Sequence, residues 1–127
     1  MGYQYVCNEL YQYLLSPELC QKILFLNDAQ FRAAEKDPAA FDFSEVEVLI
    51  CQPFFMRQPL LEQMPKLKWL QDTGAGFDAA DCEYIKEHGI TLTNSRGVMS
   101  RSIAEDVMLK MLFFARKVRE VEQNKKD

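Results

Sequence analysis

The sequence predicts an α/β fold in which a parallel β-sheet is covered by helices. Short runs rich in β-branched and aromatic residues alternate along the chain with segments of helical character, which is the order typical of parallel sheets. The chain has 127 residues, of which 48% are hydrophobic and 27% charged. It is therefore long enough to bury one core without disulfides or a structural metal.

The first half of the chain contains two segments that read as strands without difficulty. Residues 3–7 predict a first strand, and the run VEVLIC at 46–51 predicts the clearest one, which ends before a proline. Between them, the pattern favours a helix over 17–26 with Ser16 as its N-cap. Residues 30–34 are interpreted as a short strand.

The second half continues the alternation. Residues 58–65 predict a short helix, and 68–72 a strand that runs straight into a glycine loop. Residues 79–87 predict a helix that a His-Gly pair ends, since this pair is a common C-cap. A strand is expected over 90–93, and a long helix over 102–123.

The long helix at 102–123 has an unusually wide apolar surface. Ser102 and Glu105 match a capping box at its start. Its apolar residues form two adjacent stripes, Ile103, Val107, Met111, Phe114 and Val118 beside Ala104, Met108, Leu112 and Ala115, which Leu109 and Phe113 widen further. A surface helix needs only about a 100° apolar face. Two interpretations remain open, a central core helix and a dimer or interdomain interface.

Composition excludes several classes of function. A net charge of −4 and a pI near 5.1 argue against a nucleic-acid or anionic membrane partner. Four dispersed cysteines and a single histidine do not make a standard metal site, so buried free thiols are expected. Neither a signal peptide nor a membrane span is apparent. We therefore expect a cytoplasmic protein that binds no metal.

The stretch TGAGFDA at 73–79 matches the pattern G-x-G-x-x-A of dinucleotide-binding loops. About 20 residues further on, Asn94-Ser95-Arg96 superficially suits the 2′-phosphate of NADP. Two details oppose this hypothesis. Asp78 is expected to cap the following helix and so to repel a pyrophosphate, and a long α/β stretch precedes a motif that normally follows a first strand.

The same loop has a second possible use. Gly74 and Gly76 permit positive φ and close approach, so the amides around Ala75 and Gly76 are able to bind a small anion such as a carboxylate. The alternative is a tight strand-to-helix turn without a ligand. The residues alone leave both interpretations open.

Residues 65–117 resemble the N-terminal part of the D-isomer-specific 2-hydroxyacid dehydrogenases. Three stretches carry the resemblance, the glycine loop at 73–78, TLTNSRG at 91–97, and Ile-Ala-Glu at 103–105. They occur in order and at the spacing of the family, which includes D-lactate, glycerate and phosphoglycerate dehydrogenases and glyoxylate reductases. Residues 46–64 fit more loosely, and 1–45 contribute little.

The resemblance implies a fold and a domain organisation. Enzymes of this family have two lobes, with the active site in the cleft between them. Residues 1–99 would form the substrate-binding lobe, a flavodoxin-like three-layer α/β structure with a parallel sheet. Residues 100–127 would form a long helix leading to a nucleotide-binding domain that this sequence lacks. The implied partners are a small 2-hydroxy or 2-keto acid and a second copy that forms a homodimer through 102–123.

The resemblance also implies the site residues. Main-chain amides of the loop would bind the substrate carboxylate, and Arg96 is a candidate for a bidentate contact with it, although an ordinary surface ion pair is the alternative. The other candidates are residues of the loop, Val98 and Met99 of a hinge stretch, and Phe54 as an aromatic wall of the site. Packing in the core is an equally good explanation for Phe54. The predicted substrate-binding residues are Gly74, Ala75, Gly76, Phe77, Arg96, Val98, Met99 and Phe54.

No catalytic residue is assigned to this chain. The catalytic Arg, Glu and His of the family would lie beyond Asp127, and His88 is interpreted as a surface cap residue. NAD or NADP would serve the full-length enzyme, whereas we expect no cofactor to bind this chain, which alone is predicted to be inactive. Two alternatives are a stand-alone dimeric module that binds a small acid or a partner without catalysis, and a half Rossmann domain that binds NADP.

Overall fold

The structure is a computed structural model that describes residues 3–14 and 16–125. The chain divides into two compact units, Met1–Ser95 and Arg96–Asp127. The first unit contains a β-sheet with its helices, and the second contains two helices.

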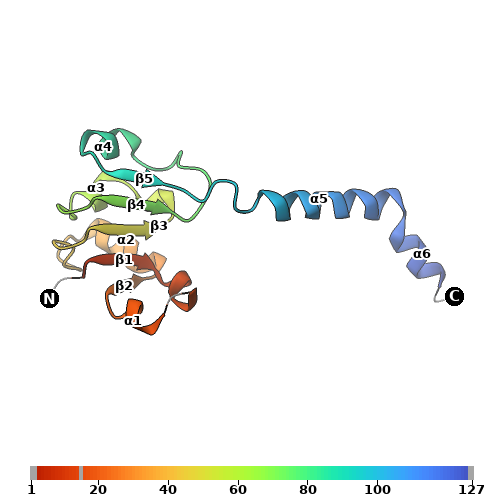
Figure 1. Ribbon diagram of the computed structural model, residues 1–127, viewed down its shortest axis with the longest axis horizontal. Helices are drawn as coiled ribbons and strands as arrows, with labels where there is room; N and C mark the ends of the chain where they lie inside the picture. Colours follow the sequence, from red (N-terminus) through yellow and green to blue (C-terminus); the bar gives the residue numbers. More distant parts are fainter. Residues whose placement is uncertain (1–2, 15, 126–127) are drawn as a thin grey trace. The chain divides into compact units, whose positions relative to one another are not determined.

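The first unit is built on five strands, and all neighbouring strands are parallel (Figure 1). They are β1 (Tyr5–Asn8), β2 (Ile23–Leu26), β3 (Val48–Cys51), β4 (Trp69–Asp72) and β5 (Thr91–Thr93). The sheet order is β2-β1-β3-β4-β5, so the chain moves outward from β1 to β2 and then returns past β1 to build the other half. This order is the flavodoxin-like one, and the predicted α/β class is confirmed.

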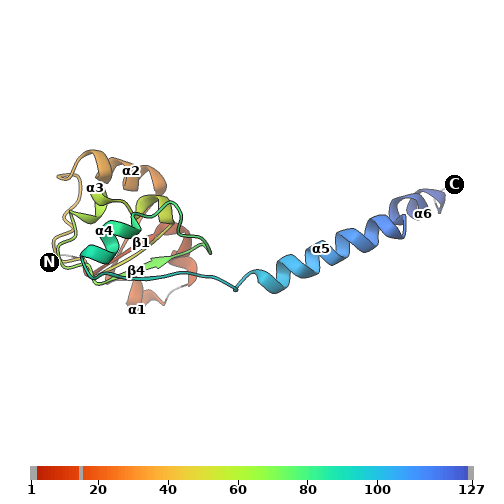
Figure 2. The same cartoon turned by 90° about the horizontal axis from the view of Figure 1, so that it is seen from above.

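Short helices connect the strands. They are η1 (Glu9–Leu14), α1 (Pro17–Cys20), α2 (Asp28–Lys36), η2 (Pro53–Phe55), α3 (Gln58–Leu61) and α4 (Cys82–Glu87). Figure 2 shows α2 and α3 on one side of the sheet and α1 on the other. The predicted strands at 3–7, 46–51, 68–72 and 90–93 are confirmed, each with small shifts of its ends.

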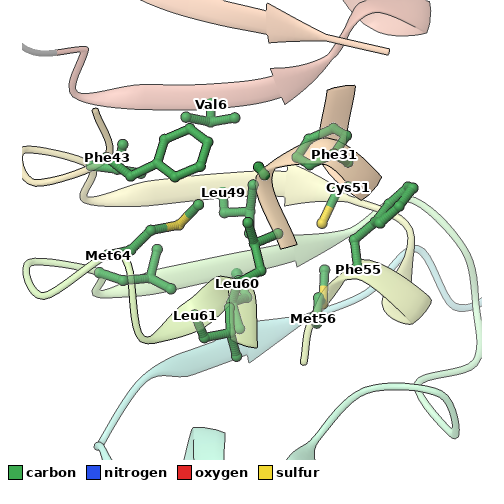
Figure 3. Packing of buried hydrophobic residues seen from close by; sticks show 14 of the residues in the cluster. Val6, Phe31, Phe43, Leu49, Cys51, Phe55, Met56, Leu60, Leu61 and Met64 are labelled. Carbon is green, nitrogen blue, oxygen red and sulfur yellow. The ribbon is translucent and has the colours of Figure 1, made fainter. Parts of the chain in front are cut away.

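The core lies between the sheet and helices α2 and α3 (Figure 3). Alternate residues of the strands point into it, among them Leu49 and Cys51 of β3 and Leu70 of β4, all fully buried. Helix α2 contributes Phe31, whose ring stacks on Phe55 with centroids 4.8 Å apart. Burying each such side chain contributes about 1.5–3 kcal/mol, so this face holds the unit together.

Two local predictions in the first half are wrong. The expected helix over 17–26 ends at Cys20, and Ile23–Leu26 is strand β2, which pairs with β1 over all four residues. The expected strand at 30–34 lies inside α2. Asn27 accepts a hydrogen bond from the amide of Gln30 at 2.9 Å, and the Gln30 side chain accepts from the Asn27 amide at 2.9 Å. This capping box starts the helix.

The second unit contains α5 (Ser100–Ala115) and α6 (Val118–Asn124) in place of one continuous helix. The break falls at Lys117, whose φ of 49° is left-handed. The predicted capping box is also wrong, because α5 begins before it. The Ser102 hydroxyl donates to the Met99 carbonyl at 3.1 Å, and Glu105 pairs with Arg101 at 2.8 Å.

No residue of α5 or α6 is buried in the described part of the chain. Both interpretations of this segment, a central core helix and a dimer or interdomain interface, stay predictions. Its large exposed side chains are Ile103, Val107, Met108, Leu109, Met111, Leu112, Phe113, Phe114 and Val121. Across residues 3–14 and 16–125, no helix has both the length and the apolarity that crossing a membrane requires.

Candidate functional site

Polar side chains gather where the parallel strands end. Asn8 ends β1 and Asp72 ends β4, and both are buried. Cys51, the last residue of β3, lies opposite Asp72 in the register of the sheet. Ligands of open α/β sheets bind outside the carboxyl ends of the strands, so this edge is the place to look for a site.

The glycine loop occupies this edge at 73–81, between β4 and α4. Among the described residues, the amides of Ala75, Gly76 and Phe77 donate to no protein acceptor, and all three residues are exposed. The Gly74 amide is different, because it donates to the Asp72 carboxylate at 2.7 Å. Three successive unused donors at a strand end are suited to one small anion such as a carboxylate.

Asp72 organises the start of this loop, although the sequence analysis did not single it out. It is fully buried, its Oδ1 accepts from Gly74, and its Oδ2 has no partner among the described residues. A Cβ at position 74 would lie 3.3 Å from Oδ1. Close approach therefore explains Gly74. Neither Gly74 nor Gly76 uses the positive φ that glycine permits; the described glycines with positive φ are Gly89 and Gly97.

Residues 94–95, which follow β5, form hydrogen bonds with the glycine loop and with the end of β4. The Ser95 amide donates to the Gly74 carbonyl at 2.8 Å, and the Ser95 hydroxyl donates to the Asp72 carbonyl at 3.2 Å. The Asn94 side-chain amide donates to the Ala75 carbonyl at 2.9 Å. Residues 94–95, considered above for an NADP ribose, thus position the loop.

Acidic groups around the loop oppose the binding of a dinucleotide there. Helix α4 begins after Asp81, whose carboxylate accepts from the Tyr84 amide at 3.1 Å, so the prediction that Asp78 caps this helix is wrong. The positive end of the helix is nevertheless occupied by a carboxylate. Asp72 and Asp78 add two more acidic groups nearby, and a pyrophosphate would be repelled by a few kcal/mol at an effective dielectric near 20.

The two phenylalanines after β3 have different environments. Phe55 is 1% exposed and belongs to the core, whereas Phe54 is 38% exposed. Their ring centroids lie 4.4 Å apart. Core packing therefore accounts for Phe55, and Phe54 remains a candidate wall for a ligand.

Three predicted site residues, Arg96, Val98 and Met99, belong to the second unit. Val98 is 73% exposed and Met99 is 62% exposed, and Gly97, between Arg96 and Val98, turns the chain with φ of 88°. Their role in substrate binding stays a prediction.

His88 is the C-cap residue of α4, as predicted. Its Nδ1 lies 2.9 Å from the Tyr84 carbonyl oxygen, and its ring stacks on Tyr84 with centroids 3.9 Å apart. These contacts explain His88 by local structure.

The expectation of four buried thiols holds only in part. Cys7 and Cys51 are buried, Cys20 is half-buried, and Cys82 is exposed, so the prediction is wrong for Cys82. Burial raises the pKa of Cys7 to about 11, and burial together with the nearby Asp72 carboxylate raises the pKa of Cys51 further. The described residues contain no group of three or more His, Cys, Asp or Glu side chains able to hold a metal.

A second polar cluster, also missed, ties β1 to its neighbours. The Asn8 side-chain amide donates to Asp28 at 2.9 Å and to Gln52 at 3.3 Å, and Asn8 Oδ1 accepts from the Leu10 amide at 3.1 Å. The sequence signal that could have identified Asn8 was a polar residue at the end of a predicted strand, and the same signal identifies Asp72.

Comparisons with known proteins bear on the family and fold of the chain. The family model described as the catalytic domain of D-isomer specific 2-hydroxyacid dehydrogenases matches residues 9–115. A glyoxylate/hydroxypyruvate reductase B from Klebsiella pneumoniae is 31% identical over 84 residues, which are 66% of this chain and 26% of the relative. The chain thus spans about a quarter of the length of the curated relatives that it matches.

Solved structures show the same fold. A D-isomer specific 2-hydroxyacid dehydrogenase family protein from Aeromonas salmonicida is 26% identical with a TM-score of 0.62, covering 97% of this chain and 39% of that one. An NAD-dependent formate dehydrogenase from Staphylococcus aureus, solved with NAD, is 23% identical with a TM-score of 0.55, covering 91% and 34%.

Proposed function

This chain belongs to the family of D-isomer-specific 2-hydroxyacid dehydrogenases, and on that premise we propose that it forms the substrate-binding lobe of such an enzyme. The enzyme would interconvert 2-hydroxy and 2-keto acids with NAD or NADP. Residues 1–99 would bind the acid, and 100–127 would lead to a nucleotide-binding domain. The chain alone would not catalyse the reaction.

One observation carries this proposal, the run of unused amides at Ala75, Gly76 and Phe77. A carboxylate is common to every 2-hydroxy and 2-keto acid, and main-chain amides at a sheet edge bind it without a positively charged side chain. Phe54 and Phe77, both partly exposed aromatic residues, would contact the remainder of the acid. Arg96, Val98 and Met99 stay predicted substrate-binding residues.

The cofactor would bind elsewhere in the enzyme. When bound, NAD or NADP supplies or accepts the hydride. The residues of the glycine loop bind and orient the acid in this proposal, and the acidic groups Asp72, Asp78 and Asp81 oppose a pyrophosphate there.

The first test is a ¹H–¹⁵N NMR titration of the chain with glyoxylate and hydroxypyruvate, the acids in the name of the Klebsiella relative. We expect both to shift the amides of residues 75–77, and we expect NADH and NADPH to shift none of them. Saturable NADPH binding at the loop would instead support the half Rossmann alternative. If no 2-keto acid shifts the loop, the proposal is wrong.

A variant at Gly76 sharpens the test. A Cβ at position 76 would contact only the Asp78 carboxylate at 3.6 Å, and the backbone there does not need positive φ. Gly76→Val should therefore fold normally while its branched side chain obstructs the neighbouring amides. We expect the dissociation constant for glyoxylate to rise at least about tenfold, or 1.4 kcal/mol. Ala79→Val, in the same loop, is the matched control.

A second candidate function rests on the exposed apolar surface of α5. A stand-alone module that dimerises through 102–123 and binds a small acid without catalysis would also use the amide loop. Addition of a separately expressed nucleotide-binding domain from a relative distinguishes the two, because a substrate lobe should bind it and a stand-alone module should not.

A further inference from the structure

A cavity of about 440 Å³ opens beside α2, η2 and the start of α3. Its walls are formed by Arg32, Glu35, Phe54, Phe55, Arg57 and Pro59. Of the predicted substrate-binding residues only Phe54 lines it, and no residue of the glycine loop does. The cavity therefore presents a different set of contacts from the amide loop.

The aromatic wall of this cavity adjoins a stacked pair of rings in the core. Phe31 stacks on Phe55 with centroids 4.8 Å apart and an interplanar angle of 24°, and Phe54 lies 4.4 Å from Phe55. Phe31 and Phe55 are buried, whereas Phe54 is 38% exposed. The Phe54 ring is tilted by 52° against Phe55, and a planar apolar group placed against Phe54 would remove that ring from water.

Two guanidinium groups lie at the same cavity. Within the described residues, Arg32 and Arg57 form no ion pair and no side-chain hydrogen bond. The guanidinium carbon of Arg32 lies 5.9 Å from the centroid of the Phe55 ring, so a cation–π contact positions it. Its N–H groups remain available for a carboxylate, which guanidinium groups bind in bidentate geometry.

Glu35 limits the charge that this cavity accepts. Its half-buried side chain lines the cavity on the same helix as Arg32 and forms no ion pair among the described residues. Two positive groups and one negative group leave a net charge of +1. A second carboxylate on a ligand would be repelled by Glu35, so a monoanion matches this charge better than a dianion.

We propose that this cavity is a binding site for an aromatic monocarboxylate, whose carboxylate contacts are separate from the amide loop and which shares only Phe54 with the predicted substrate-binding residues. The ring packs against Phe54, and the carboxylate binds between Arg32 and Arg57. The site does not depend on the proposed dehydrogenase function.

The test is a ¹H–¹⁵N NMR titration of the chain with benzoate, which has no 2-keto group. Benzoate should shift the amides of residues 32–35 and 54–57 at lower concentration than the amides of 75–77, which are also suited to a carboxylate. Arg32→Gln combined with Arg57→Gln should weaken binding by about tenfold or more. Arg101→Gln, at a side chain 91% exposed on α5, is the matched control and should bind benzoate as before. Phe54→Leu should also weaken binding.

Three results would overturn the proposal. They are the absence of shifts at 32–35 and 54–57, equal binding of benzoate by the double Arg variant, and equal affinity for inorganic phosphate, cyclohexanecarboxylate and benzoate. Glyoxylate added to the same sample reports on the amide loop independently. If glyoxylate does not shift the amides of residues 75–77 while benzoate binds the cavity, the proposed function is contradicted and this inference is not.

Discussion

Asp72 is the residue that most affects the candidate site. Its buried carboxylate accepts the Gly74 amide, and its backbone carbonyl accepts from Ser95. It therefore holds the strand end, the loop and the segment after β5 together. It also places a carboxylate beneath the amides that we propose to bind an acid.

Asp72→Asn separates these two effects. Asparagine keeps an Oδ1 acceptor for Gly74 and removes the carboxylate, so repulsion of a bound anion decreases. We expect glyoxylate to bind roughly threefold or more tightly, since even a screened charge pair contributes a fraction of a kcal/mol or more. The measurement is the NMR titration described above. Asp72→Ala, which loses the acceptor, should bind less tightly than Asp72→Asn, and unchanged or weaker binding by Asp72→Asn would contradict the role of the charge.

The buried thiols predict how stability depends on pH. The pKa of Cys7 is raised from 9.0 to about 11 in the folded chain, because burial disfavours the thiolate. Above pH 9 the unfolded chain releases this proton and the folded chain keeps it, so stability is complete below pH 9 and declines as the pH rises toward 11. The expected loss from Cys7 approaches about 2–3 kcal/mol by pH 11.

Urea unfolding below pH 9 and near pH 11 measures this loss. Cys7→Ala should be less stable than the parent at the lower pH but should show a smaller decline, whereas Cys82→Ala, at an exposed position, should retain the full decline. Identical pH profiles for all three proteins would show that Cys7 does not contribute.

At the scale of elements, short-range hydrogen bonds decide where several helices begin and end. The Asn27–Gln30 capping box starts α2, and this helix buries Phe31 and Ala34 against the sheet. The signal was present in the sequence as Asn-x-x-Gln, yet the interpretation of 30–34 as a strand overlooked it. Asp81 starts α4 in the same way, three residues after the position predicted for the cap.

Removal of the capping box should destabilise the first unit. Asn27→Ala loses the acceptor for the Gln30 amide, and we expect the free energy of unfolding to fall by about 1 kcal/mol. Urea denaturation followed by circular dichroism measures it. Asn27→Ser, which retains a side-chain acceptor, should recover most of the loss. If Asn27→Ala were as stable as the parent, the cap would not contribute to α2.

At the scale of the whole molecule, α5 carries a series of large apolar side chains that are exposed among the described residues. Met108 is 54% exposed and Leu112 is 56% exposed, one turn apart on the same helix. The proposed homodimer would bury this surface. Met108→Glu combined with Leu112→Glu should convert a dimer into a monomer in sedimentation velocity, because two buried charges without partners are costly.

Gln123→Glu, on α6, is the matched control for that experiment and should leave the dimer intact. A parent chain that sediments as a monomer at high concentration would contradict the proposed dimer.

The sequence by itself determined the fold class and much of the family assignment. Strand 46–51 and the His88-Gly89 helix end are specified by local patterns of apolar residues, proline and glycine, which act over a few residues. The glycine loop was located in the same way. The resemblance of 65–117 to the dehydrogenases follows from motifs in order and was confirmed by the family match over 9–115.

The tertiary structure decided the strand pairing and the hydrogen bonds of the glycine loop, which local sequence patterns do not specify. Ile23–Leu26 is a strand because β1 supplies a parallel partner, and neither segment specifies that pairing alone. The amides of 75–77 remain unused because Asp72, Asn94 and Ser95 bind the other polar groups of the loop, from positions up to 23 residues apart. Hydrogen bonds and burial between distant segments depend on the folded chain, so the candidate site became defined only there.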